Sequence, residues 1–316
     1  MTLIVFGAGS IGSLFGGKVA QLSPDNRKNY EPVVFVGRER HVAAIRNRGL
    51  TINSPSGESQ INRVTAVTSL TQVQDIKYVL VTCKAYDNDV ASSVLKTHAN
   101  RRMKLFILQN GVGNEEFFLP EFKNRIYRLT TTEAARLEGP GIVNHAASGL
   151  TILGKHGGRV DRAGKEFASL LSIAGFKTEL SLDVDQPVWT KFLVNIPINP
   201  LGALYRLRNG DLLKRRKIVQ RFERLVTETL TVFDRMGIKT AFIDPLEEIK
   251  AVAMQTAQNK SSMLQDIERG RKTEIDFLNG QVIRLGKETG IETPENLDVY
   301  RRIKSLENRA TGSLVA

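Results

Sequence analysis

Short apolar runs alternate with amphipathic stretches through the first 180 or so residues. The apolar runs lie at 3–6, 33–36, 79–83 and 105–108, and helical periodicity marks 11–21, 39–47, 87–98 and 161–174. Runs of this length are typical of buried strands, and strands that alternate with helices predict a parallel sheet with right-handed crossovers. Segments 50–53 and 60–67 suggest an added hairpin, and 127–132 and 142–154 suggest further strands.

The pattern changes at about residues 181–187, where strand signals give way to long helical periodicity. Helices are expected at 215–236, 245–264, 274–289 and 295–308. Gly237 suits a helix C-terminus and Pro245 the first position of the next helix. We therefore expect an α/β protein with an N-terminal Rossmann-type parallel sheet domain over 1–181 and an all-helical C-terminal domain over 182–316.

Composition narrows the class of protein. The apolar runs are far shorter than the roughly 20 residues of a membrane helix. The first residues read as a strand rather than a secretory signal, and a single cysteine excludes an internal disulfide, so a cytoplasmic location is expected. The net charge of +12 is compatible with nucleic acid, but the sequence contains no finger, RNP motif or long basic arm. A modest positive field also suits a phosphorylated cofactor and a carboxylate substrate.

A glycine-rich motif follows the first apolar run. Residues Gly7, Ala8, Gly9, Ser10, Ile11 and Gly12 form G-x-G-x-x-G between the run 3–6 and an amphipathic stretch. The first glycine permits a tight turn, the second lets the backbone approach a pyrophosphate, and the third lets helix and strand pack closely. A glycine-rich turn without a ligand is the alternative, but strand, turn and helix context favours a dinucleotide site.

The end of the second apolar run bears on the choice of cofactor. An NAD site usually has Asp or Glu there to bind the ribose, whereas this chain has Arg38, which suits a 2′-phosphate and favours NADP. A solvent-exposed arginine that opens a helix is the alternative. Glu39 could serve NAD if the turn is shifted by one residue.

Polar residues follow the next two apolar runs. Lys84 comes after 79–83 and Asn110 after 105–108, at the edge of the sheet where ligands bind in such folds. Lys84 could contact the cofactor phosphate, and Asn110 could bind the cofactor or the substrate. Cys83 is interpreted as a buried strand cysteine, with a reactive thiol beside Lys84 as the minor alternative.

The second domain contains two polar groupings in apolar surroundings. Lys191, Asn195 and Asn199 are spaced four apart, so on a helix they share one face, although Pro197 should remove a hydrogen bond and kink that helix. Further on, Ser262 precedes Thr273 and Glu274; Thr273 resembles an N-cap, which would put Glu274 in a first helical turn. A polar substrate could supply partners for these groups.

At these residues the sequence resembles the ketopantoate reductase (2-dehydropantoate 2-reductase) family along nearly its whole length. The resemblance rests on GAGSIG (7–12), VTCKA (81–85), QNGVGN (109–114), TTTEAAR (130–136), TKFLVNIPINPL (190–201), SSMLQDI (261–267), TEIDFLNG (273–280) and TPEN (293–296). It implies a Rossmann domain followed by a helical domain like that of 6-phosphogluconate dehydrogenase. It also implies an active site in the interdomain cleft, where NADPH reduces ketopantoate to pantoate for pantothenate and coenzyme A synthesis.

The resemblance also implies roles for individual residues. Lys191 matches the family's catalytic lysine, and Glu274 matches its essential carboxylate. Positions that hold nicotinamide or substrate match Asn110, Asn195, Asn199 and Ser262, and contacts to the cofactor phosphate match Arg38 and Lys84. No metal is required for this chemistry. Glu133 departs from the expected pattern, where another polar residue such as histidine is anticipated, and is interpreted as a surface difference.

Three other functions are compatible with parts of the sequence. A paralogous reductase of another branched 2-oxo acid would carry the same motifs. A non-catalytic NADP-binding regulator would need the glycine turn but not Lys191, Glu274 or Ser262. Nucleic-acid binding would rest on charge alone and is not expected, nor is membrane binding. The long C-terminal helices offer a surface for a homodimer.

Overall fold

The computed structural model describes residues 2–27, 30–62 and 64–312. The chain forms two compact units, each with its own core. The first consists of residues up to Gln109 together with Gly113–Val184, and the second consists of Asn110–Val112 with the residues from Asp185 onward. The short segment Asn110–Val112 therefore groups with the second unit, although it follows a strand of the first.

The first unit is built on an eight-stranded sheet in the order β12-β11-β8-β7-β6-β1-β2-β5. All neighbouring strands are parallel except β11 and β8. The strands are β1 (Thr2–Phe6), β2 (Val33–Val36), β5 (Thr65–Val67), β6 (Ile76–Val81), β7 (Lys104–Ile107), β8 (Ile126–Thr131), β11 (Leu150–Lys155) and β12 (Lys177–Leu180). The predicted parallel sheet is confirmed, with β12 as an additional strand that the pattern did not indicate.

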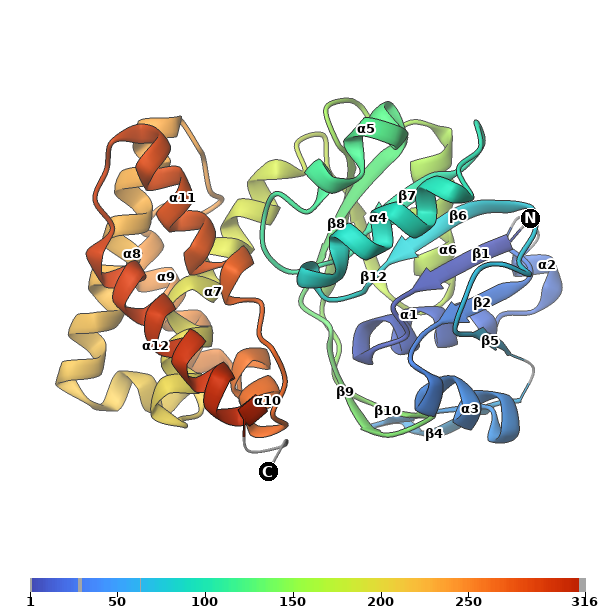
Figure 1. Cartoon of the computed structure of the whole chain (residues 1–316), viewed down its shortest axis with the longest axis horizontal. Helices are drawn as coiled ribbons and strands as arrows, with labels where there is room; N and C mark the ends of the chain where they lie inside the picture. The colour runs from blue at the N-terminus through green and yellow to red at the C-terminus, as the bar shows by residue number, and fades with distance from the viewer. Residues whose placement is uncertain (1, 28–29, 63, 313–316) are drawn as a thin grey trace. The chain divides into compact units, whose positions relative to one another are not determined.

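Helices cover both faces of this sheet (Figure 1). Successive strand residues point to opposite faces, so Leu3 and Val5 belong to one apolar cluster and Ile4 to another. The cluster of Leu3 includes residues of α1 (Ser10–Ala20), α3 (Glu39–Arg48) and α6 (Arg162–Ile173). The cluster of Ile4 includes residues of α4 (Asn88–Thr97) and α5 (Leu119–Phe122). The short helix α2 (Pro24–Arg27) precedes β2.

A second, four-stranded sheet lies against α1. Its order is β4-β3-β10-β9, and its strands are β3 (Leu50–Ser54), β4 (Gly57–Ile61), β9 (Ala134–Gly139) and β10 (Ile142–Ala147). The expected hairpin is thus β3 with β4, but the end of its predicted second segment leaves it, because β5 pairs with β2 of the large sheet. Helix α1 contacts β3, β9 and β10, so it is enclosed between two sheets.

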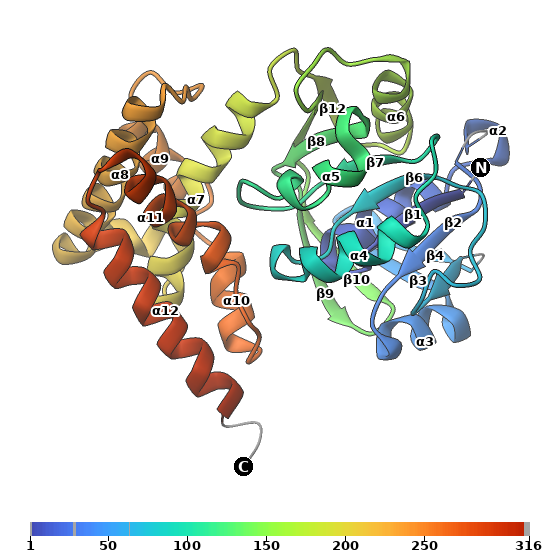
Figure 2. The ribbon, with the colours of Figure 1, turned by 45° about the horizontal axis from the view of Figure 1, so that its top comes forward.

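The described residues of the second unit form helices. They are α7 (Asp185–Tyr205), α8 (Arg216–Met236), α9 (Pro245–Gln255), α10 (Ser262–Glu268), α11 (Asn279–Thr289) and α12 (Pro294–Gly312), with 3₁₀ turns η4 (Asn209–Lys214) and η5 (Ile275–Phe277). Helix α7 packs against α8, α10 and α12 (Figure 2). The helix predicted at 245–264 is wrong in one respect, because residues 256–261 interrupt it.

Among the described residues, no helix combines the length and the apolar composition needed to cross a membrane.

Candidate active site

The glycine-rich turn joins β1 to α1 with little free space beneath it. Gly7 has φ +101°, a backbone conformation that favours glycine, and a Cβ there would come within 2.3 Å of the Cys83 backbone nitrogen. A Cβ on Gly12 would come within 2.3 Å of the Gly7 carbonyl oxygen. The two glycines therefore let the start of α1 pack closely on the ends of β1 and β6.

Above Gly9 the surroundings are open. A Cβ on Gly9 would meet only the Gly7 carbonyl oxygen, at 3.9 Å. Gly9 is also the N-cap of α1, and the first turn that follows reads Ser-Ile-Gly-Ser. Free N–H groups and the positive end of the helix dipole at such a turn attract phosphate. These residues fit the pyrophosphate of a dinucleotide.

Two hydrogen bonds to the small sheet and to α3 support this turn. The Ser10 hydroxyl accepts a hydrogen bond from the Leu137 backbone N–H at 3.1 Å. The Nδ1 atom of the buried His41 accepts a hydrogen bond from the Gly141 backbone N–H at 3.0 Å. In a neutral ring the proton is therefore on Nε2, which lies 3.0 Å from the Ser13 hydroxyl oxygen. Burial lowers the pKa of His41, which favours this neutral form. His41 could not be identified from the sequence, because its partners Ser13 and Gly141 are distant along the chain.

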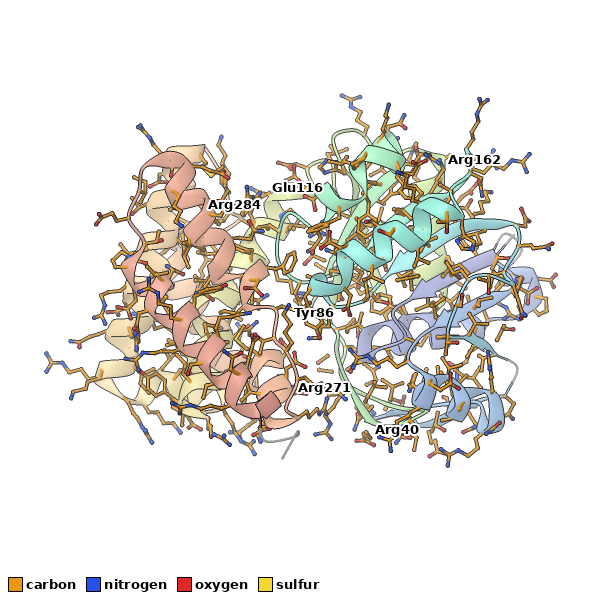
Figure 3. All side chains as sticks on the ribbon, viewed as in Figure 1. Arg40, Tyr86, Glu116, Arg162, Arg271 and Arg284 are labelled. Atoms are coloured by element: carbon orange, nitrogen blue, oxygen red, sulfur yellow. The ribbon has the colours of Figure 1, made fainter. Side chains whose placement is uncertain are left out.

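The end of β2 is basic and exposed. Arg38 is the N-cap residue of α3 in an extended conformation, and Glu39 occupies the first turn of that helix. Both side chains are exposed, as is that of Arg40 (Figure 3). Glu39 has the helix-start role that the dipole favours, and the guanidinium groups beside it suit a phosphate.

A chain of buried amides links the ends of β6 and β7. Gln109 Nε2 donates to the Cys83 carbonyl oxygen at 2.7 Å and to Asn88 Oδ1 at 2.8 Å, and Asn88 Nδ2 donates to Asn114 Oδ1 at 2.9 Å. This network fixes the turn that carries Lys84, a half-buried residue directly before the 3₁₀ turn η1 (Ala85–Asp87). The Gln109 and Asn114 side chains were not predicted, although both belong to the quoted QNGVGN segment.

The interpretation of Cys83 as a buried strand residue is wrong. Strand β6 ends at Val81, and Cys83 lies in the turn that follows, where it is half-buried and not part of a disulfide. Gln109 Nε2 lies 3.4 Å from its sulfur. Its position in the turn follows from Gly7, whose backbone packs directly against Cys83.

Helix α7 carries three of the predicted polar residues. Lys191 and Asn195 are half-buried and Asn199 is 6% exposed. Because the helix is continuous from Asp185 to Tyr205, their spacing of four places them on one side of it. Pro197 and Pro200 lie inside this helix without ending it. The Ser261 hydroxyl donates to the Asn199 carbonyl oxygen at 3.2 Å.

The loop after α10 brings Glu274 to Asn110. Asn110 Nδ2 donates to Glu274 Oε2 at 3.4 Å, within the second unit. Glu274 is 6% exposed. The expectation that it lies in a first α-helical turn is wrong, since it precedes the 3₁₀ turn η5 and α11 begins only at Asn279. Thr273 anchors the loop, because its backbone N–H and its hydroxyl both donate to Glu307 Oε1, at 2.7 and 2.6 Å.

The two adjacent serines of α10 differ. Ser262 is exposed at the first position of the helix, whereas Ser261 is buried as its N-cap and accepts from the Leu264 N–H. The contact with α7 is made by Ser261. The N-cap spacing would have singled out Ser261 from the sequence.

Glu133 is not a surface residue, and that interpretation is corrected. It is 7% exposed, and its Oε2 lies 2.5 Å from Nε2 of the buried His145 on β10. It follows β8, where the Thr131 hydroxyl accepts from its backbone N–H. Glu133 thus joins the end of the large sheet to the small sheet.

Each unit therefore carries part of the predicted chemistry. Because β1, β2, β6 and β7 are parallel, the glycine turn, Arg38, Lys84 and Gln109 all lie at the carboxyl edge of the sheet. The second unit holds a lysine and two amides on α7, with Glu274 buried beside Asn110. The lysine and the amides can donate hydrogen bonds, and the Glu274 carboxylate accepts them. Among the described residues, no group of three or more His, Cys, Asp or Glu side chains could hold a metal ion.

Comparisons with known proteins agree on one family. The family model "Ketopantoate reductase PanE/ApbA" matches residues 3–158, and "Ketopantoate reductase PanE/ApbA C terminal" matches residues 183–307. A 2-dehydropantoate 2-reductase of Archaeoglobus fulgidus is 33% identical over 305 residues, which cover 96% of this chain and 97% of that protein.

Solved structures share the fold of this chain. A PanE/ApbA family ketopantoate reductase from Ralstonia eutropha JMP134 has a TM-score of 0.89 at 27% identity, covering 98% of this chain and 99% of that chain. D-mandelate dehydrogenase, solved with NADH and anilino(oxo)acetate, has a TM-score of 0.89 at 25% identity, with the same coverage.

Proposed function

The chain belongs to the ketopantoate reductase family of oxidoreductases, which use a nicotinamide dinucleotide, and on that premise we propose that it reduces 2-dehydropantoate (ketopantoate) to (R)-pantoate with NADPH. The reaction would serve pantothenate and coenzyme A synthesis. In this proposal residues 1–181 bind the cofactor, and 182–316 supply the substrate-binding and acid groups.

The cofactor side of the proposal rests on the carboxyl edge of the sheet. The N–H groups at the start of α1, after the open position of Gly9, would bind the pyrophosphate. The exposed Arg38 would bind the 2′-phosphate that distinguishes NADP from NAD, and Lys84 would add charge nearby. Asn110 would hydrogen-bond the nicotinamide or the substrate.

The acid of the proposed reaction is Lys191. When bound, a reduced nicotinamide would supply a hydride for the carbonyl carbon of the substrate. Negative charge then grows on the carbonyl oxygen, and the Lys191 ammonium group stabilises it with a hydrogen bond and transfers a proton to it. The family's essential carboxylate matches Glu274, which would hold the lysine or bind a substrate hydroxyl.

The remaining polar groups would orient the substrate. Asn195 and Asn199 follow Lys191 at four-residue intervals on α7, so their amides face the same side as the acid. With Ser262 they would bind the substrate carboxylate, which accepts hydrogen bonds, and the substrate hydroxyl, which both donates and accepts them. Such groups would discriminate between substrates, because a substrate that lacks the matching polar atoms leaves them without hydrogen-bond partners.

One observation carries the proposal: Lys191, Asn195 and Asn199 lie on one side of a single continuous helix whose neighbouring side chains are largely apolar and buried. A binding protein that lacks a reaction needs no lysine in such a position. We infer that this row of polar groups is built for a polar reactant rather than for packing.

The test is the Lys191→Ala variant, assayed by NADPH oxidation with ketopantoate. Loss of a general acid should lower kcat on the order of 100-fold or more. Lys217→Ala, which removes an exposed lysine at the start of α8, serves as the matched control and should keep the wild-type kcat. Full activity of Lys191→Ala would exclude the proposed acid, and NADPH titration of the variant shows whether cofactor binding is intact.

A further inference from the structure

Pro200 creates a local problem in the helix that carries the proposed acid. A proline has no backbone N–H, so Pro200 cannot donate to the carbonyl oxygen of Ile196, four residues earlier. Ile196 is fully buried, where a carbonyl without a donor is unfavourable. The side chain of Asn279, the first residue of α11, meets this carbonyl: its Nδ2 donates to the Ile196 oxygen at 3.3 Å. Asn279 is itself completely buried.

The orientation of the Asn279 amide is fixed by its other partner. The Glu228 carboxylate accepts from the backbone N–H groups of Glu295 and Asn296, at 2.7 and 3.0 Å, and from Asn296 Nδ2 at 2.8 Å. Because a carboxylate accepts, Asn296 must turn its Nδ2 to Glu228 and its Oδ1 away from it. That Oδ1 accepts from Asn279 Nδ2 at 2.9 Å. Asn279 therefore presents its donor, not its acceptor, to α7.

We propose that Asn279 is a positioning residue, whose amide replaces the N–H that Pro200 removes and so fixes the turn of α7 between Asn195 and Asn199. This inference rests on the proposed function of α7. Ile196 and Pro200 each follow one of those asparagines directly, so a change in this turn alters the spacing of Asn199 from Lys191. Asn279 lies on α11, Asn296 on α12 and Glu228 on α8, so this chain of hydrogen bonds ties the geometry of α7 to three other helices.

The experiment compares Asn279→Leu, which removes the donor, with the double variant Asn279→Leu/Pro200→Ala, which returns a backbone N–H to α7. Asn279→Leu should lower kcat/KM for ketopantoate at least about tenfold, the usual scale of a lost buried hydrogen bond. Its KM for NADPH should stay within about twofold, because the proposed contacts to the cofactor phosphates, at the glycine turn, Arg38 and Lys84, lie in the first unit. The double variant should recover kcat/KM to within about threefold of the wild type.

A control separates positioning from general stability. Val282→Ala removes buried methyl groups from the same helix α11 without removing a hydrogen bond. It should lower the free energy of unfolding and leave kcat/KM near the wild-type value. An equal fall in kcat/KM for Val282→Ala and Asn279→Leu would overturn the inference, as would failure of Pro200→Ala to restore activity in a folded double variant. If Asn279→Leu does not fold, Asn279→Ala, which removes the donor without adding bulk or charge, replaces it in the same comparison.

Hydrogen exchange gives a readout that does not depend on the reaction. Hydrogen exchange of the backbone amides of 192–203 should be faster in Asn279→Leu than in the wild type. In the double variant it should be slower than in Asn279→Leu. Lys191→Ala is measured beside them. One outcome would refute only the positioning role of Asn279 and leave the proposed acid intact. In that outcome Lys191→Ala loses activity, while Asn279→Leu keeps both the activity and the hydrogen exchange of the wild type. A wild-type enzyme inactive on ketopantoate would refute the proposed substrate, while the exchange result would still decide the role of Asn279.

Discussion

Two glycines of the same motif are predicted to have separable effects when each is changed to alanine. Gly9 has φ −85° and ψ −159°, which alanine adopts, and its Cβ would have 3.9 Å to the nearest atom. Alanine is a poorer N-cap than glycine by some tenths of a kcal/mol, but it also restricts the unfolded chain, which stabilises by about 0.4–1 kcal/mol. The free energy of unfolding of Gly9→Ala should therefore change by less than about 0.5 kcal/mol.

Gly12→Ala should behave in the opposite way. Its Cβ would lie 2.3 Å from the Gly7 carbonyl oxygen and 2.5 Å from the Thr82 hydroxyl oxygen. The Thr82 hydroxyl donates to that same carbonyl at 2.9 Å, so the new methyl group would push on both partners of a hydrogen bond. Overpacking of this kind costs about 1–3 kcal/mol of unfolding free energy.

The assay pairs urea unfolding of the free protein with an NADPH titration. Gly9→Ala should keep its stability but bind NADPH at least about tenfold more weakly, a loss of about 1.4 kcal/mol, because its methyl group stands where the backbone would face the pyrophosphate. Gly12→Ala should lose stability. Wild-type NADPH affinity in a stable Gly9→Ala protein would show that the phosphates do not approach Gly9. Equal destabilisation by both variants would contradict the packing described for the turn.

Two further predictions concern the cofactor edge of the sheet. Arg38→Ala should raise the KM for NADPH about 10- to 100-fold, the effect of losing a charge-assisted hydrogen bond, and leave the KM for NADH within about twofold; equal effects on both cofactors would contradict a 2′-phosphate contact. Burial lowers the pKa of His41, so the unfolded chain binds its proton more readily and the wild type should lose stability as the pH falls below about 6.5. Urea unfolding measures the free energy of unfolding at about pH 7.5 and about pH 5, and its fall between these two values should be smaller in His41→Gln than in the wild type. An equal fall in both proteins would exclude His41 as the source of the pH dependence.

The main architecture was predictable because its signals are local. The apolar runs at 3–6, 33–36 and 105–108 are strands of the large sheet, and the glycine turn lies where its spacing indicated. Of the small sheet only the hairpin of β3 and β4 was predictable, because β10 pairs with β3 from a part of the chain about 90 residues earlier. The helix predicted at 245–264 failed for another reason. Ala253, Ala257 and Leu264 are spaced as on one helix, but the backbone turns within 256–261 and Ser261 caps a new helix.

The candidate site shows the same division. Lys191, Asn195 and Asn199 could be placed on one side of a helix from their spacing alone, and the helix is present. The partners of that helix could not be found in this way. Nothing local connects Asn279 with Pro200, about 80 residues away, and the hydrogen bond between Asn279 and Ile196 depends on how α11 packs.

Glu133 shows how burial reverses an interpretation. As a single charged residue in a polar segment it suggested a surface position, and only the contact with His145 on β10 reveals it as a buried partner. Thr273 and Glu274, in the loop before α11, also depend on a contact that is distant along the chain. Thr273 is held by Glu307 of α12, so the local capping pattern did not predict where the helix begins.

The most direct measurement is the rate of reduced-cofactor oxidation by the purified protein with ketopantoate, run with NADPH and with NADH, and with other 2-oxo acids in place of ketopantoate. Benzoylformate, the 2-oxo acid that corresponds to mandelate, belongs in this panel because D-mandelate dehydrogenase shares the fold. The proposal predicts rapid turnover with ketopantoate and NADPH, and slow turnover with NADH or the other acids. Cofactor binding without turnover of ketopantoate, or faster turnover of another 2-oxo acid, would contradict it.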